Sequence, residues 1–289
     1  MPRSYNTRDT FRTRVAWTHY SYDDPIVWPR QPGKAHLHLF FGNSLVDAFT
    51  SLPEDPGSIR TRCRSAAAGG TANCRGYWMP ALFDGSGNVL PPDFSLWYYK
   101  AGYQVNTNNA VKPPTDLKII VGKASATAAN PQNNRHLAWN CTGDYRNDTP
   151  YIPTNCVPGS ILGLHMNYPA CWNGRDLDSP DHISHMAYGN GQSGCPASHP
   201  VQIPEITLNI KWKVGNSGTA GWKLSSDMYD VTTQTPGGHS IHSDWIMGWN
   251  PDIMQRVLDH CNNIEADCVV DNLGDGGGLS TRHQNPMYR

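Results

Sequence analysis

Histidine and aspartate residues gather in three short segments of this 289-residue chain, which read AHLHLFFGN, LDSPDHISHMAY and GGHSIHSDW. Together with the nearby His199, the three segments hold seven of the twelve histidines. Imidazoles and carboxylates are the side chains that move protons and coordinate metals. Because the segments lie far apart in the sequence, we expect the fold to bring them together in one groove.

The first segment carries His36 and His38, two positions apart. In a β-strand, residues at this spacing point to the same side. The pair is therefore a candidate for metal binding. The alternative is that both imidazoles are simply hydrogen-bonded in a polar groove.

The second segment carries Asp178, Asp181, His182 and His185. If it forms a helical turn, Asp181 and His185 lie one turn apart and face the same way. Asp178 is then also a candidate cap for that turn. A purely structural role for the whole segment is the alternative.

The third segment places His242 and Asp244 on one face of a predicted strand, with His239 in the preceding glycine-rich turn. A carboxylate beside an imidazole fixes its tautomer and raises its basicity. The alternative is a charge-paired strand at the surface.

These residues support a first hypothesis, a secreted carbohydrate-active enzyme that cleaves a polysaccharide and requires no cofactor. A glycoside hydrolase needs two carboxylates, for which Asp181 and Asp244 are the candidates and Asp178 the reserve. A polysaccharide lyase needs a base, for which His182 or His242 is the candidate. Hydrolysis and elimination both stay open.

Two further hypotheses come from the same segments. In the second, His36, His38 and His242, with His185 or Asp181, bind zinc or copper, and copper would imply oxidative chemistry. In the third, the protein is a non-catalytic extracellular glycan-binding or structural protein. The test that separates them is whether the three segments converge.

The ten tryptophans are many for a chain of this length. Flat aromatic rings stack on sugar faces, although core packing is their commoner role. The candidates for substrate binding are Trp172, Trp222, Trp245 and Tyr98.

Composition narrows the setting of such a site. Lys and Arg number 23 against 24 Asp and Glu, a balance that argues against a nucleic-acid-binding protein. No apolar run reaches the ~18 residues of a membrane span. Eight cysteines predict disulfides and a secreted, extracellular protein, from which we expect a signal peptide to have been removed. Pairing of neighbours predicts Cys63–Cys74, Cys141–Cys156, Cys171–Cys195 and Cys261–Cys268.

The elements that must position the site are mostly strands. The run EITLNIKWKV alternates, with Ile206, Leu208, Ile210 and Trp212 on one face. One helix is predicted near 250–263, with Asn250 as N-cap and Pro251 in the first turn. We therefore predict one all-β domain over residues 1–289, a β-sandwich or jelly roll with long disulfide-stapled loops and a C-terminal helix.

Several long strings carry a family resemblance. DDPIVWPRQPGKAHLHLFFGN, CRGYWMPALFDGSGNVLPP, PACWNGRDLDSPDHISHMAY, CPASHPVQIPEITLNI and HSDWIMGW closely resemble the domain-of-unknown-function family nineteen-ninety-six. The resemblance runs from about residue 15 to residue 261. It implies a secreted bacterial or fungal protein and suggests extracellular glycans as partners.

The cysteine pattern makes a testable prediction. Thiol titration of the denatured, unreduced protein should find almost no free thiol, because the even count and short spacings predict complete pairing. Loss of one native bridge should lower the free energy of unfolding by roughly 2–5 kcal/mol. Two or more free thiols per chain would contradict complete pairing.

Overall fold

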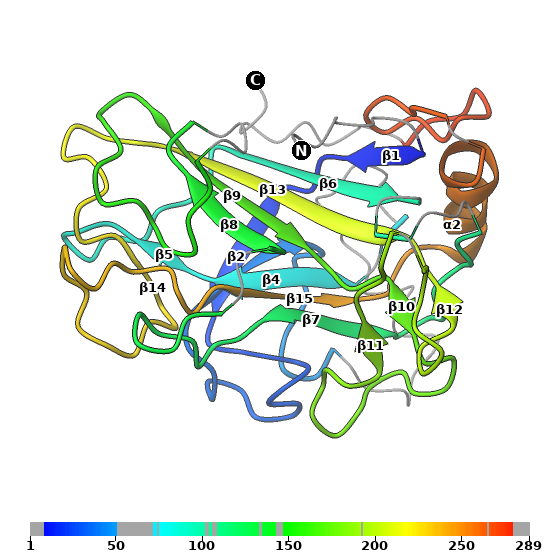
Figure 1. Ribbon diagram of the computed structural model, residues 1–289, viewed down its shortest axis with the longest axis horizontal. Helices are drawn as coiled ribbons and strands as arrows, with labels where there is room; N and C mark the ends of the chain where they lie inside the picture. The colour runs from blue at the N-terminus through cyan, green and yellow to red at the C-terminus, as the bar shows by residue number, and fades with distance from the viewer. Residues whose placement is uncertain are drawn as a thin grey trace.

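Two antiparallel five-stranded sheets form the body of the protein, seen as neighbouring layers in Figure 1. The computed structural model describes residues 9–50, 72–73, 75–101, 104–105, 109–132, 135–142, 147–191, 193–264 and 266–279. The predicted all-β sandwich is confirmed.

The first sheet has the strand order β1-β6-β13-β9-β8. Its strands are β1 (Thr10–Thr13), β6 (Phe94–Lys100), β13 (Glu205–Lys213), β9 (Ile161–Asn167) and β8 (Leu137–Asn140). The second sheet has the order β2-β3-β4-β15-β7. Its strands are β2 (Trp17–Ser21), β3 (His38–Gly42), β4 (Gly76–Pro80), β15 (His242–Ile246) and β7 (Lys118–Gly122).

Two small sheets lie beside the large ones. One joins β11 (Met186–Ala187), β10 (Cys171–Trp172) and β12 (Val201–Gln202), and the other joins β14 (Lys223–Leu224) to β5 (Leu82–Phe83).

The main core lies between the two large sheets. The predicted apolar face of β13, from Ile206 to Trp212, contributes to it from the first sheet. From the second sheet come Leu39 and Phe41 of β3 and Trp245 of β15. Successive strand residues point to opposite faces. The alternate residues of β3 and β15, which include His38 and His242, therefore lie on the outer face of the second sheet.

The C-terminal helix was predicted near 250–263. Helix α2 (Pro251–Val257) is followed directly by a π-helical turn, η1 (Leu258–Asn262), at one end of the sandwich (Figure 1). The Asn250 side chain accepts hydrogen bonds from the amides of Asp252 and Ile253, at 2.8 and 3.4 Å. The predicted helix and its N-cap are confirmed.

Three predicted disulfides are confirmed: Cys141–Cys156, Cys171–Cys195 and Cys261–Cys268. Cys63 and Cys74 lie outside the described residues. In the described part of the chain, none of the helices is both long enough and apolar enough to cross a bilayer.

A buried carboxyl group lies at the start of β13. Glu205 is paired in register with Lys100 of β6 and is 2% exposed. Its Oε2 accepts a hydrogen bond from the Gln104 amide at 3.1 Å. Burial raises the pKa of Glu205 from 4.5 to about 7, against the opposing influence of the Lys100 charge.

This shift predicts how stability depends on pH. Between pH 4.5 and about 7 the folded protein binds more protons at Glu205 than the unfolded chain does, so the free energy of unfolding falls as pH rises through this window. The slope from one group is at most roughly 1.4 kcal/mol per pH unit. Urea unfolding between pH 4.5 and 7.5 should show a flatter profile for Glu205→Gln than for the wild type. The exposed Asp230→Asn should leave the profile unchanged, and equal slopes in Glu205→Gln and wild type would contradict the assignment.

Candidate metal centre

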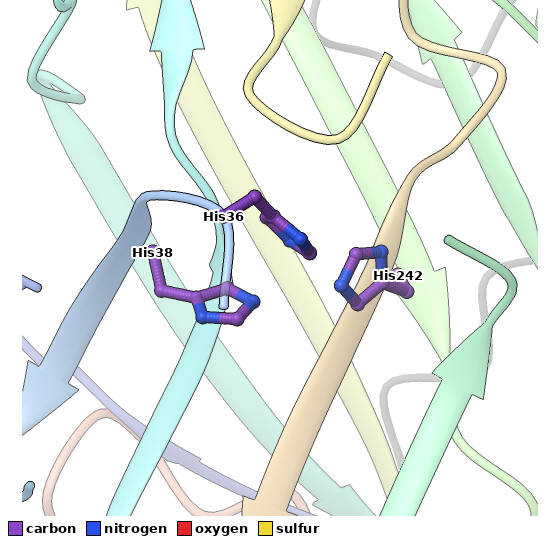
Figure 2. A group of neighbouring side chains, drawn as sticks. All are labelled: His36, His38 and His242. Atoms are coloured by element: carbon purple, nitrogen blue, oxygen red, sulfur yellow. The ribbon is translucent and has the colours of Figure 1, made fainter. Parts of the chain in front are cut away.

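Three histidines meet on the outer face of the second sheet. His36 lies two residues before β3, His38 opens β3, and His242 opens β15. One ring nitrogen of each lies within 4.8 Å of the corresponding nitrogens of the other two. The ring centroids are 4.2 Å apart for His36 and His38 and 5.0 Å for His36 and His242. Figure 2 shows the three imidazoles facing a common space.

The order of the strands explains why two histidines so far apart in sequence meet. His38 pairs with Pro80 of β4, and Trp78 of β4 pairs with Asp244 of β15. Two residues along the same register, His242 lies beside Pro80. Neighbouring strands are about 5 Å apart, so the backbones at His38 and His242 are separated by roughly 10 Å, with Pro80 between them. Their ring centroids are only 5.8 Å apart. The two imidazoles reach toward each other over this proline.

Backbone carbonyl groups fix the tautomers of two rings. The Nδ1 of His38 lies 2.9 Å from the carbonyl oxygen of Asp23, and the Nδ1 of His242 lies 2.8 Å from that of Ser240. Because a carbonyl oxygen only accepts, both Nδ1 atoms carry the proton and donate. Each Nε2 therefore presents a lone pair, the arrangement found when the second nitrogen of an imidazole binds a metal.

The environment keeps these rings uncharged. Burial lowers the pKa of His36 to about 2 and that of His38 to about 3, and the neighbouring imidazoles add to both shifts. Burial also lowers the pKa of His242. The Nε2 atoms of His36 and His38 are buried without a hydrogen-bond partner. The cluster consists of three neutral imidazoles, the form that binds metal ions.

An apolar cluster on the same face supports the histidines. Phe40 of β3 stacks on Trp78 of β4 with the ring centroids 5.6 Å apart, and the two pack with Ile26, Val46 and Ile246. Ile26 and Val46 belong to the segments before and after β3. Their burial holds these segments against the sheet.

A tight turn before β3 positions the Asp23 carbonyl. Oδ1 of Asp24 accepts hydrogen bonds from the amides of Ile26 and Val27, both at 2.9 Å. This turn anchors the chain that leads to His36. Asp24 was not among the residues singled out from the sequence, although the string DDPIVW contains it.

Asp244 lies on the same outer face as His242, two residues along β15. It is 1% exposed, and both its carboxylate oxygens lack a hydrogen-bond partner. Burial, with the negative charge of Asp24, raises the pKa of Asp244 well above its usual value. Asp244 is not a member of the three-histidine group.

The second predicted segment does not contribute to the three-histidine group. Nε2 of His185 donates to the carbonyl oxygen of Lys118 at 2.6 Å, and its Nδ1 lies 2.9 Å from Oγ of Ser179. Oδ1 of Asp181 accepts hydrogen bonds from Oγ of Ser179 and the amide of Ser184. These contacts hold a local turn together.

The other two members of this segment form an ion-paired group. Asp178 contacts Nδ1 of His182 at 2.8 Å and Nζ of Lys118 at 3.0 Å. Asp178 and His185 both contact Lys118 of β7, so the segment packs against the edge of the second sheet. Catalytic roles for Asp178, Asp181 and His182 stay predictions.

The predicted aromatic platforms differ in exposure. Trp245 is fully buried between the sheets, and Trp222 is 5% exposed. Trp172 is half-buried and donates its Nε1 hydrogen to the carbonyl oxygen of Asp176 at 2.7 Å. Tyr98 is half-buried on β6, with Nζ of Lys100 5.0 Å from its ring centroid. A sugar would reach Trp245 only if the core opened, and the role of all four in sugar binding stays a prediction.

Two exposed aromatic residues near the histidines were missed from the sequence. Tyr22 is 56% exposed, and its carbonyl oxygen accepts a hydrogen bond from the amide of Ala35, the residue before His36. Trp28 is 37% exposed in the same loop. Their position in the segment that leads to His36 was the one feature of the sequence that could have indicated them.

The comparison with protein families gives one match. A family model described as a domain of unknown function, DUF1996, matches residues 24–249, which confirms the resemblance seen in the sequence. The matched range contains His36, His38 and His242. No curated protein and no solved structure matches the chain.

Proposed function

The chain belongs to the DUF1996 family, and we propose that it is a metalloprotein in which His36, His38 and His242 bind one transition-metal ion. The supporting observation is the convergence of three neutral imidazoles whose nitrogens lie within 4.8 Å of one another. The Nε2 atoms of His36 and His38 are buried without a hydrogen-bond partner, which is unfavourable. A bound metal ion would satisfy both nitrogens and would take His242 as its third ligand.

The donor set favours zinc. Three imidazole nitrogens with one position left for water or substrate is a common arrangement in catalytic zinc sites. Met186, whose thioether is a soft donor of the kind that favours copper, packs in the main core. Copper binds imidazole sites at least as tightly as zinc, so both ions belong in the binding experiment.

The chemistry that follows is metal-assisted hydrolysis. A zinc ion bound there would supply an activated water molecule. The protein orients the rings of His38 and His242 through the carbonyl groups of Asp23 and Ser240, and His36 is the least buried of the three ligands. No other described group of histidine, cysteine and acidic residues has this geometry.

An extracellular polysaccharide is the substrate class that we propose. Three disulfides are consistent with an extracellular protein. The exposed rings of Tyr22 and Trp28 lie on the loop that leads to His36 and are suited to stacking on sugar rings. If no metal binds, a non-catalytic glycan-binding protein becomes the better proposal.

Metal titration tests the proposal directly. The metal-free wild type should bind one equivalent of zinc, measured by calorimetry and by metal analysis after gel filtration. His38→Ala and His242→Ala should each weaken zinc binding by at least ~100-fold, because each removes one of three ligands.

The matched control is His199→Ala, whose ring contacts Ser198 and the carbonyl oxygen of Ser184 outside the group. It should bind zinc like the wild type. Circular dichroism must show that every variant is folded. A folded wild type that binds neither zinc nor copper, or binding unaffected by both ligand substitutions, would disprove the metal site.

A further inference from the structure

We propose that Asp244 and Asp24 bind a second, hard divalent cation on the same sheet face as the three-histidine cluster. The inference goes beyond the proposed transition-metal site, since it uses different donors and a different ion. It starts from the buried carboxylate that the histidine cluster leaves unexplained.

Asp244 is a buried acid without a partner. It is 1% exposed, and neither of its oxygens has a hydrogen-bond donor. The charge of Asp24, which also acts on Asp244, has the same sign and offers no compensation. Burying an unpaired carboxylate is very costly, and a protonated carboxyl group would still need an acceptor for its O–H. A cation satisfies both oxygens at once.

Asp24 supplies the second carboxylate. It is 4% exposed, and its Oδ1 is held by the amides of Ile26 and Val27. The carbonyl oxygen of Asp23, the preceding residue, lies 2.9 Å from Nδ1 of His38. Ile26 packs with Trp78, the residue of β4 that is paired with Asp244. These contacts hold the turn of Asp24 against the sheet face that carries Asp244.

Other buried polar atoms on this face also lack partners. Nε1 of Trp78, the residue paired with Asp244, is buried without an acceptor. The Nε2 atoms of His36 and His38 are in the same condition. Buried polar groups are normally satisfied by protein, water or ions. An ion with its water molecules, bound on this sheet face, would satisfy them.

The donors determine the kind of ion. Carboxylate oxygens suit Ca²⁺, Mg²⁺ and Mn²⁺, which complete their coordination with water molecules. Imidazole nitrogens suit zinc and copper. The two neighbouring sites therefore select different ions.

A shared proton is the competing explanation, because two close carboxyl groups can share one proton instead of binding an ion. It makes the opposite prediction. Asp244→Asn would then change no cation binding.

The experiment is an Mn²⁺ titration followed by electron paramagnetic resonance, on protein whose histidine cluster has first been filled with zinc. The wild type should bind one Mn²⁺, displaced by Ca²⁺, with a dissociation constant of roughly 10⁻⁴–10⁻³ M, as in other extracellular sites. Asp244→Asn keeps the size of the side chain and should weaken Mn²⁺ binding at least ~10-fold. His242→Ala, without zinc, should still bind Mn²⁺.

Asp271→Asn is the matched control, since Asp271 is another acid with a buried unpartnered oxygen. Its backbone amide donates to the carbonyl oxygen of Arg12 in β1, in the other large sheet. It should bind Mn²⁺ like the wild type. Wild-type protein that binds neither Mn²⁺ nor Ca²⁺, or Asp244→Asn that binds them equally well, would overturn the second site. Wild-type protein that binds Mn²⁺ but not zinc would disprove only the transition-metal site. The two proposals can therefore fail separately.

Discussion

The packing of the second sheet against the first is the constraint on which the site depends. Phe41 of β3, Tyr77 of β4 and Trp245 of β15 are fully buried between the sheets. A slip of one residue in any of these strands would move its aromatic side chain out of the core and reverse both faces. The large apolar area of these rings thus fixes the register. His38, His242 and Asp244 are placed on the outer face as a consequence.

The outer face needs a second layer to become a site. An exposed sheet face would leave its histidines in water, with ordinary pKa values. Here Ile26 and Val46 pack on Phe40 and Trp78 and hold the flanking segments against the sheet. The resulting burial is the main reason why the imidazoles are neutral. The small apolar cluster therefore determines the chemistry of the polar groups beside it.

Part of this arrangement could be predicted from the sequence, because strand periodicity is a local property. The spacing of His242 and Asp244 correctly indicated a shared strand face. His36 and His38 do converge, although His36 lies outside β3. The same rule assigns Trp245 to the opposite face from Asp244, which argues for core packing over sugar binding. The N-cap of α2 could be predicted for the same reason, because Asn250 bonds to amides two and three residues further along the chain.

Other features depended on contacts that no local pattern reveals. The second segment looked as rich in acid–base chemistry as the others, yet Asp181 and His185 bond within their own turn and to the backbone of β7. Asp24 was overlooked because its importance comes from its place over the sheet.

Preorganised carbonyl contacts at His38 and His242 mean that a metal ion would meet rings that are already oriented, so little binding energy would be lost in ordering them. Because the ligands come from β3 and β15, on either side of β4, such an ion would also cross-link the sheet and stabilise the folded state in proportion to its affinity.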